Sequence, residues 1–267
     1  MKILVIGGGN MGLTYAQSFL RAKITTQRDM MILEKNAKKA EELAKKDIGT
    51  VYGNPEQCLN NADLIILAVK PQDTDALFAS LKPYVDAQQV FVSIMAGVTI
   101  ETISTALGVK KVIRAMPNLP AQIGMGMTTF TSTDDVTRIE LVMVQNLINT
   151  TGKTVYVENE RFIDATTAIS GSGPAYVYYF MQAMMEAAKE MGFTASEAEL
   201  LVSQTFKGAV DLYNKSDLSC AEWIARVSSK GGTTEAAVKT FKKHKVHEDI
   251  MRGAKAALDR AIELGKK

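Results

Sequence analysis

Short apolar runs alternate with amphipathic stretches through the first 158 residues of the chain. The runs are rich in Val, Ile and Leu on both sides, which is typical of strands that are covered on both faces. The predicted strands are Lys2–Ile6, Met30–Leu33, Asp63–Val69, Gln89–Ile94 and Lys111–Ala115. Helical patterns such as Asn36–Lys46 and Thr99–Leu107 lie between them. This order predicts an α/β fold with a parallel, doubly wound sheet. Two later strands, Met125–Thr131 and Lys153–Val157, flank a helical pattern at Val136–Asn149.

The pattern changes after Glu158, and from Arg161 onward almost every stretch has helical spacing. We therefore predict two domains, an α/β domain at 1–158 and an all-helical domain at 159–267. The stretch Pro174–Met191 is apolar nearly all the way round, so a helix there needs burial on several sides. A region of about 100 residues rarely buries such a helix by itself. We predict that it packs in a subunit interface; the alternative is burial within one chain.

Composition and charge narrow the function classes. The 267 residues fit one large or two modest domains at roughly 150 residues each. Lys plus Arg number 31 and Asp plus Glu number 29, so the surface lacks the basic excess of a nucleic-acid-binding protein. No apolar run reaches the ~18 residues of a membrane span, and we expect the apolar start to form a first strand rather than a signal peptide. Two cysteines without a CxxC pattern predict a cytoplasmic protein without a zinc site.

A glycine-rich turn directly follows the first predicted strand. Gly7-Gly8-Gly9-Asn10-Met11-Gly12 fits the G-x-G-x-x-G pattern and opens a helical stretch, which is the context that gives the pattern meaning. The first glycine allows the tight turn, the second lets a pyrophosphate approach, and the third permits close packing of helix and strand. The helix N-terminus offers free N–H groups to the anion. The sequence predicts a dinucleotide site in a Rossmann-type domain.

The residues after the second strand leave the choice of dinucleotide open. Glu34 follows Gly12 by 22 residues, about where an acidic side chain accepts hydrogen bonds from the adenine ribose of NAD. Lys35, Lys38 and Lys39 follow at once, and a lysine can neutralise the extra phosphate of NADP. The same lysines also fit a solvated helix face. The cofactor is therefore expected to be NADH or NADPH.

Further motifs, in order along the chain, carry a family resemblance. They are Ala68-Val69-Lys70-Pro71, Ser93-Ile94-Met95-Ala96-Gly97, Arg114-Ala115-Met116-Pro117-Asn118, Ser170-Gly171-Ser172-Gly173-Pro174-Ala175-Tyr176 and Val227-Ser228-Ser229-Lys230-Gly231-Gly232-Thr233-Thr234. Together with the glycine turn they resemble the Δ1-pyrroline-5-carboxylate reductase family over essentially the whole chain. The last two motifs are the specific ones. Lys230 stands where the family usually has a proline, which predicts a less pre-organised loop.

The resemblance implies reduction of the cyclic imine to L-proline, the last step of proline biosynthesis, by hydride from a nicotinamide. It implies at least a dimer with interleaved helical domains, and larger rings of dimers occur among relatives. The substrate site it implies is Asn118 with the loop of Ser229, Gly231, Gly232, Thr233 and Thr234, where the Thr234 hydroxyl lies near the ring nitrogen. The cofactor-binding residues it implies, beside Glu34 and Lys35, are Gly7, Gly9, Asn10, Met11, Gly12, Asn54, Ala68, Val69, Lys70, Pro71, Ala96, Gly97 and Asn118.

The residue chemistry is compatible with imine reduction. The only histidines, His244 and His247, lie in a polar stretch far from the glycine motifs and are expected at the surface. A cyclic iminium is already electrophilic, so an enzyme mainly has to orient two reactants and stabilise charge. The loop 228–234 combines glycine N–H groups with threonine hydroxyls, which suits a carboxylate nest, although an ordinary helix N-cap has similar residues.

Three residues or motifs have two readings at this stage. Ser170–Tyr176 most simply begins the long apolar helix, because proline is favoured at a helix start. Lys70 suits solvent or a phosphate, and Arg114 suits a phosphate or a structural carboxylate. Two rival functions remain: a β-hydroxyacid dehydrogenase-like oxidoreductase, for which Lys189 is a poor catalytic candidate, and a non-catalytic dinucleotide-binding protein.

Overall fold

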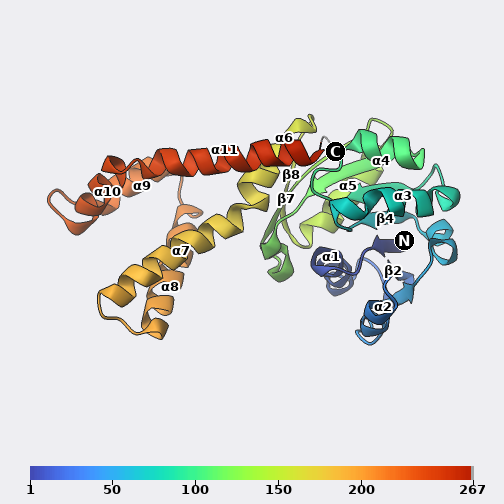
Figure 1. Cartoon of the computed structure of the whole chain (residues 1–267), viewed down its shortest axis with the longest axis horizontal. Coiled ribbons are helices and arrows are strands. Elements are labelled where there is room, and N and C mark those ends of the chain that lie inside the picture. The colour runs from blue at the N-terminus through green and yellow to red at the C-terminus, as the bar shows by residue number, and fades with distance from the viewer. Residues whose placement is uncertain (266–267) are drawn as a thin grey trace. The chain divides into compact units, whose positions relative to one another are not determined.

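A computed structural model describes residues 1–265, and these residues contain one eight-stranded sheet (Figure 1). The strand order is β3-β2-β1-β4-β5-β6-β7-β8. The strands are β1 (Ile3–Ile6), β2 (Met30–Leu33), β3 (Thr50–Tyr52), β4 (Leu64–Leu67), β5 (Val90–Ser93), β6 (Val112–Met116), β7 (Gly126–Ser132) and β8 (Gly152–Tyr156). The seven predicted strands are confirmed to within two residues at either end. The first, second, fourth and fifth strands are buried at every position, as expected for a sheet covered on both faces.

Helices cover both faces of the sheet, and each face has its own apolar core. One face packs against α1 (Asn10–Arg21), α2 (Ala37–Ala44) and α5 (Arg138–Asn149), through side chains that include Phe19, Leu43 and Leu147. The other face packs against α3 (Thr74–Leu81) and α4 (Ile100–Leu107), through Phe78, Leu81, Ile103 and Leu107. Figure 1 shows α1 and α2 on one side of the sheet and α3 and α4 on the other. The predicted doubly wound arrangement is confirmed.

The sheet differs from the predicted one in two places. β7 runs antiparallel to β6, and β8 runs parallel to β7, so the sheet is mixed rather than wholly parallel. The physical reason is the short connection after β6: only a nine-residue segment, including a 3₁₀ turn at Leu119–Ile123, leads into β7, whereas a parallel crossover needs a dozen or more residues. β3, a three-residue edge strand between Gly49 and Gly53, was not predicted.

A buried arginine ties the next helix to the sheet. The Arg114 side chain on β6 is 1% exposed, and its guanidinium donates to Glu160 Oε1 at 2.8 Å and to Asp164 Oδ1 at 2.7 Å. Asp164 lies in α6 (Arg161–Thr166), and Glu160 immediately precedes it. Glu160 Oε1 also accepts from the N–H of Ile100 at 2.9 Å. Since a buried charge needs a partner, the structural-carboxylate reading of Arg114 is confirmed.

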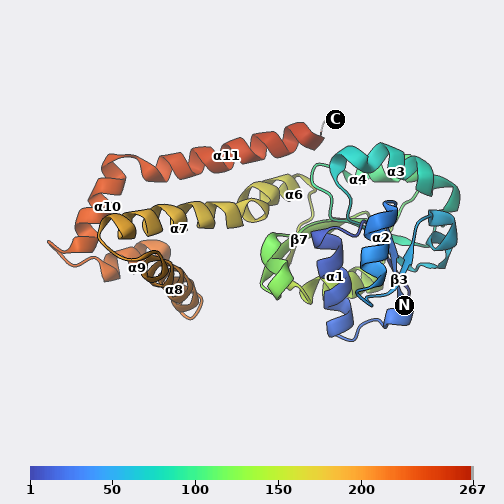
Figure 2. The same cartoon turned by 60° about the horizontal axis from the view of Figure 1, so that its bottom comes forward.

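The remaining helices follow a wide turn. A π-helical turn at Thr167–Gly171 is closed by the Ser172 N–H, which donates to the Thr167 carbonyl at 2.8 Å. Then come α7 (Gly173–Glu190), α8 (Ala195–Tyr213), α9 (Cys220–Val227), α10 (Thr233–Lys243) and α11 (Val246–Gly265). α7 and α8 pack side by side (Figure 2). The predicted all-helical second half is confirmed, and Pro174 occupies the first turn of α7 as predicted.

Contacts divide the chain into two compact units. Among the described residues, the first unit consists of 1–172 together with 257–265, and the second unit consists of 173–256. The end of α11 therefore belongs with the sheet, and α6 stays with it through the Arg114 ion pairs. The predicted domain boundary at 158/159 stays a prediction, because a compact unit and a functional domain are different divisions of a chain.

The second unit has almost no core of its own. Within 173–256 the fully buried side chains are Ala198 and Val202. Large apolar side chains are instead half or more exposed on several helices: Tyr178, Tyr179, Met191, Leu200, Val210, Leu212, Val227, Phe241 and Met251. Burial of the apolar helix α7 within one chain, the alternative named above, is therefore wrong. None of the helices in residues 1–265 has the length and apolarity needed to cross a membrane.

Candidate functional site: a dinucleotide pocket and a glycine–threonine loop

The glycine turn between β1 and α1 has the geometry that a bound pyrophosphate requires. Gly7 has a φ of +104°, and a Cβ there would lie 2.7 Å from the Ala68 carbonyl oxygen. A Cβ on Gly12 would run into the carbonyl oxygen of Gly7, so helix and strand approach too closely for any side chain. Gly9, in contrast, faces open space. The turn is therefore closed at its first and third glycines and open at its second.

The helix that begins at this turn presents unused donors. Gly9 is the N-cap residue of α1, and no side chain caps the helix. The first turn contains no acidic residue. The orphan N–H groups and the positive end of the helix dipole therefore face the open space beside Gly9, which suits a phosphate anion.

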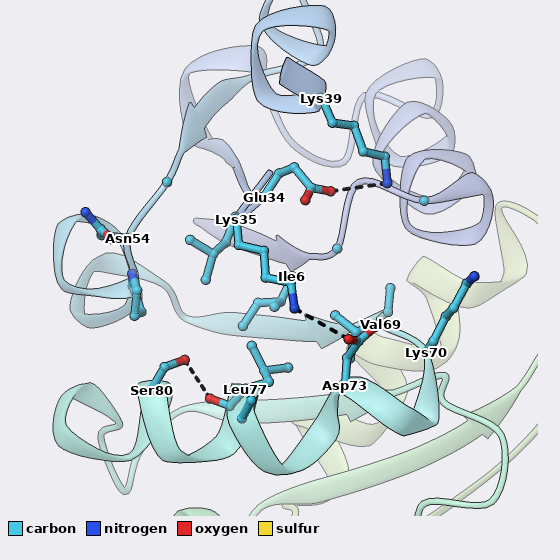
Figure 3. A pocket seen from close by; sticks show the side chains of 17 residues that line it. Ile6, Glu34, Lys35, Lys39, Asn54, Val69, Lys70, Asp73, Leu77 and Ser80 are labelled. Carbon is cyan, nitrogen blue, oxygen red and sulfur yellow. Dashed lines mark hydrogen bonds and ion pairs between the residues drawn. The ribbon is translucent and has the colours of Figure 1, made fainter. Parts of the chain in front are cut away.

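A pocket of about 480 Å³ opens beside the turn, at the carboxyl ends of β1, β2 and β4 (Figure 3). Ligands bind in such crevices of open α/β sheets. Eight of the predicted cofactor-binding residues line it: Gly7, Gly9, Glu34, Lys35, Asn54, Ala68, Val69 and Lys70. The other lining residues are Ile6, Leu33, Lys39, Gly53, Pro55, Asp73, Ala76, Leu77 and Ser80. The predicted residues thus come together from four separate segments of the chain.

Glu34 is held rigidly in the wall of this pocket. It follows β2 directly and is 8% exposed. Its Oε2 accepts from the Gly8 N–H at 3.3 Å, and its Oε1 accepts from the Asn36 N–H at 3.0 Å. The Lys39 ammonium lies 3.3 Å from Oε2. Asn36 in turn caps α2 by accepting from the Lys39 N–H at 3.0 Å. The carboxylate is therefore fixed to the glycine turn and to the start of α2 at once.

A second ion pair crosses the pocket. Lys35 Nζ lies 3.4 Å from Asp73 Oδ1, and both side chains are exposed (Figure 3). Asp73 ends a 3₁₀ turn, Pro71–Asp73, that follows β4 and leads into α3. The pair therefore joins the segments after β2 and β4 above the pocket. An exposed pair of this kind contributes little to stability, so Lys35 is free to turn toward a ligand.

Several predicted site residues lie outside the pocket lining. Asn10 is exposed, Met11 packs against the core, and Gly12 is buried beneath the turn. Pro71 begins the 3₁₀ turn after Lys70. Ala96 and Gly97 lie in the half-buried loop after β5, where Gly97 has a φ of +73°. A Cβ on Gly97 would lie 3.1 Å from the backbone and side chain of Leu264, so the end of α11 packs directly against this loop.

Asn118 joins three segments next to the end of β6. Its Nδ2 donates to the Ser170 carbonyl in the π-helical turn at 3.1 Å. Its Oδ1 accepts from the Met127 N–H on β7 at 2.8 Å. The side chain is half-buried. Asn118 thus fixes the position of the turn against the edge of the sheet, and one hydrogen of its amide remains for a ligand.

The loop 229–234 lies in the second unit and begins α10. Gly231 has a φ of +74°, and Gly232 is the N-cap residue without a side-chain cap bond. Thr233 and Thr234 occupy the first turn, so neither threonine is the N-cap; the motif does begin a helix, with Gly232 at the N-cap position. Ser229, Lys230 and Thr233 are exposed, and Thr234 is half-buried. This arrangement leaves threonine hydroxyls and N–H groups of α10 open to a small anion.

A carboxylate next to this loop, on Glu235 in the first turn of α10, was not predicted. Glu235 Oε2 accepts from the Gly231 N–H at 2.6 Å, and Oε1 lies 3.1 Å from Lys239 Nζ. The Gly231 N–H and the Lys239 ammonium hold the pKa of Glu235 below its usual value. One donor of the predicted nest is therefore already occupied by a side chain of the same chain. The i, i+4 spacing to Lys239 was a visible signal for the pair, but not for the bond to Gly231.

The two histidines lie where the sequence analysis expected them. His244 follows α10 and His247 lies in the first turn of α11, and both are exposed. Residues 1–265 contain no group of His, Cys, Asp and Glu side chains that could hold a metal ion.

Comparison with known proteins agrees with this arrangement. Residues 160–264 match the family described as pyrroline-5-carboxylate reductase dimerisation. Residues 2–97 match the family described as coenzyme F420-dependent NADP oxidoreductase. Pyrroline-5-carboxylate reductase 2 of Bacillus subtilis (strain 168) is 34% identical over 98% of this chain and 95% of the relative. The chain belongs to the pyrroline-5-carboxylate reductase family. The predicted resemblance is confirmed.

Other members of the pyrroline-5-carboxylate reductase family support the assignment. The Pseudomonas aeruginosa enzyme is 32% identical over 99% of this chain and 97% of its own length. The structure of Plasmodium falciparum pyrroline carboxylate reductase with NADP bound has a TM-score of 0.90 at 26% identity, covering 99% of this chain and 98% of that one. The Coxiella burnetii reductase has the same TM-score at 30% identity, covering 100% and 99%. A Streptomyces aurantiacus imine reductase, at 20% identity and a TM-score of 0.58, shares the fold.

Proposed function

We propose that this protein reduces Δ1-pyrroline-5-carboxylate to L-proline with NADH or NADPH. The observation that carries the proposal is family membership over the full chain, together with a dinucleotide pocket at the glycine turn. A hydride adds to the imine carbon, the C=N π electrons move to nitrogen, and nitrogen keeps the proton of the iminium. The oxidised nicotinamide and proline are the products. The protein's task is to orient the two reactants and to stabilise the charge between them.

The residues of the pocket fit a nicotinamide dinucleotide. When bound, that cofactor supplies the hydride. Gly9 and the uncapped start of α1 hold the pyrophosphate, and Gly7 and Gly12 keep the turn closed beneath it. Glu34, Lys35 and Asn54 would surround the adenosine end of the cofactor, and Ala68, Val69 and Lys70 would lie beside its ribose and phosphates, with Pro71 following them in the 3₁₀ turn. Ala96, Gly97 and Asn118 would contact the nicotinamide, as the family resemblance implies.

The loop 229–234 holds the substrate. Free N–H groups at the start of α10 and the hydroxyls of Ser229 and Thr233 bind the carboxylate of the imine. The Thr234 hydroxyl oxygen accepts a hydrogen bond from the protonated ring nitrogen and holds that proton in place during hydride addition. Hydrogen bonds to charged groups are the stronger ones, so this contact favours the iminium over the neutral imine.

The working unit is a homodimer in the cytoplasm. The exposed apolar side chains of α7 and α8 need a covering surface, and the family model matched by residues 160–264 describes dimerisation. A second copy of the chain supplies that surface, and a ring of dimers is a larger assembly consistent with the family resemblance. Cys58 and Cys220 are free thiols, which suits a reducing compartment.

An assay with the imine and each reduced nicotinamide tests the function. Turnover of Δ1-pyrroline-5-carboxylate is expected, whereas turnover of 3-hydroxy acids alone would favour the β-hydroxyacid dehydrogenase reading. Thr234→Ala should lower kcat/KM roughly tenfold or more, because a hydrogen bond to a charged group is lost. Thr240→Ala removes a hydroxyl from the exposed side of the same helix and is the matched control. If Thr234→Ala leaves kcat/KM unchanged, the result would favour a non-catalytic dinucleotide-binding protein.

A further inference from the structure

The Glu34 carboxylate has one hydrogen-bonding position left for a ligand. A carboxylate accepts at about four positions, two on each oxygen. Oε2 is occupied by the Gly8 N–H and the Lys39 ammonium, and Oε1 accepts from the Asn36 N–H. Oε1 therefore has one acceptor position left. Because the Glu34 side chain lines the pocket, this position is available to a ligand. It suits a donor of the ligand, such as a ribose hydroxyl.

A phosphate cannot use that position. The 2′-phosphate of NADPH is an acceptor group with negative charge, whereas the 2′-hydroxyl of NADH is a donor. Glu34 cannot turn away at low cost, because two backbone N–H groups hold its two oxygens and the residue is 8% exposed. Two negative charges in contact at a partly buried site repel each other more strongly than they do in water.

Of the three lysines after β2, Lys35 and Lys39 already face carboxylates, and Lys38 does not line the pocket. Lys39 Nζ lies 3.3 Å from Glu34, and Lys35 Nζ lies 3.4 Å from Asp73 (Figure 3). The two ammonium groups and the two carboxylates sum to zero charge at this end of the pocket. The exposed Lys35–Asp73 pair is weak, so Lys35 can be recruited by a phosphate. NADPH binding is therefore weakened rather than abolished.

We infer that this chain binds NADH in preference to NADPH, and that the fixed Glu34 carboxylate is the residue that determines the preference. The inference rests on the proposed function in naming which nicotinamide the reductase takes. Glu34 accepts a hydrogen bond from the adenine ribose of NADH and repels the additional phosphate of NADPH. Asp73 contributes indirectly, because it withholds Lys35 from that phosphate.

Isothermal titration of the full-length protein with NAD⁺ and with NADP⁺ tests the inference without relying on turnover. The wild-type protein should bind NAD⁺ about tenfold or more tightly than NADP⁺. Glu34→Gln keeps the shape and an acceptor for Gly8 but removes the charge, so the ratio of the two Kd values should fall by about tenfold. Asp73→Asn frees Lys35 and should strengthen NADP⁺ binding several-fold, with little change for NAD⁺.

Glu41→Gln is the matched control, since Glu41 is exposed on α2 and outside the pocket. It makes the same change in charge and should leave the ratio unaltered. Tighter or equal binding of NADP⁺ by the wild-type protein overturns the inference, and so does a Glu34→Gln ratio equal to that of the wild type. If Glu34→Gln does not fold, the inference is still tested by the ratio of the two Kd values in the wild-type protein and by the change in that ratio in Asp73→Asn. A preference for NAD⁺ without reduction of the imine would instead overturn the proposed function alone.

Discussion

The first unit and the second unit bury their apolar side chains in opposite ways. The first unit has a core on each face of its sheet, with Phe19, Phe91 and Phe130 fully buried. The second unit buries only Ala198 and Val202 and leaves Tyr179 on α7 73% exposed. Both units have well-formed helices, so helix formation alone does not distinguish them. The two units differ in whether the apolar faces of their helices pack within the same unit or stay exposed.

This contrast shows that the two units depend on different things for stability. Removal of apolar area from water is the main stabilising contribution to folding, and the first unit obtains it within one chain. The second unit leaves that area available to another surface, as expected for a region whose final packing is completed by association. Substitutions in the two units should therefore have different consequences.

The largest expected effect is on assembly. Tyr179→Glu places a charge on the exposed apolar face of α7, and burial of an unpaired charge in an interface is strongly unfavourable. We expect the proposed dimer to dissociate at micromolar concentration, as measured by light scattering after size-exclusion chromatography. Ile139→Glu is the control, because Ile139 on α5 of the first unit is 83% exposed. Dissociation by both variants, or by neither, would contradict the contrast between the units.

The next effect separates cofactor binding from assembly. Gly12→Ala forces a Cβ against the Gly7 carbonyl oxygen, so the glycine turn must open. We expect dinucleotide binding to weaken by about 100-fold, since the pyrophosphate subsite is displaced. Titration calorimetry gives the Kd, and light scattering should show an unchanged oligomer. Normal binding by this variant would mean that the turn does not hold the cofactor.

A smaller effect concerns the proposed substrate loop, 229–234. Glu235→Ala removes the carboxylate that accepts from the Gly231 N–H, so this donor becomes available to the substrate carboxylate. We expect KM for the imine to fall by several-fold with little change in kcat. Glu248→Ala, an exposed substitution in the first turn of α11, is the control for the loss of charge. An increase in KM would show that Glu235 supports the loop instead of competing for it.

The smallest effect is on the pH dependence of stability. Burial acts to raise the pKa of Glu140, but hydrogen bonds from Lys111 and Thr137 outweigh it and leave the pKa below the ordinary 4.5. A pKa that is lower in the folded state stabilises the fold above pH 4.5, and that contribution is lost as the pH falls through the folded value. Glu140→Gln should lower Tm by a few degrees at pH 7, and the difference should shrink toward pH 3 in thermal melts. A difference independent of pH would exclude the carboxylate charge as its cause.

Sequence patterns predicted most of the sheet. The two errors in that prediction, the direction of β7 and the absence of β3, have physical causes. Apolar runs of Val, Ile and Leu mark buried strands regardless of direction, so they could not show that β7 is antiparallel to β6. β3 has only three residues, Thr50–Tyr52, and lies at the edge with a half-exposed pattern, so no apolar run marks it. Direction and edge pairing depend on connections and on neighbours that a local pattern does not contain.

The site was also predicted only in part, because a local pattern shows residues at fixed spacings but not contacts between distant segments. The glycine turn and Glu34 lie at fixed spacings from the first strand, and both line the pocket. The Lys35–Asp73 pair joins residues 38 positions apart, and the Arg114–Asp164 pair joins residues 50 positions apart. These pairings arise from the order of strands in the sheet and from the position of α6, neither of which is written in the spacing of the residues themselves.

The π-helical turn at Thr167–Gly171 changes the phase of the helical repeat between α6 and α7. One additional residue in this turn advances the helical wheel by about 100° relative to a regular helix. Deleting a single residue there would let the backbone close as an ordinary α-helix, yet each side chain of α7 would emerge about a quarter-turn or more from its present direction. A one-residue deletion inside a run of helical residues therefore changes the direction of every α7 side chain relative to the turn itself, whereas the same deletion in an exposed loop can be absorbed by the loop.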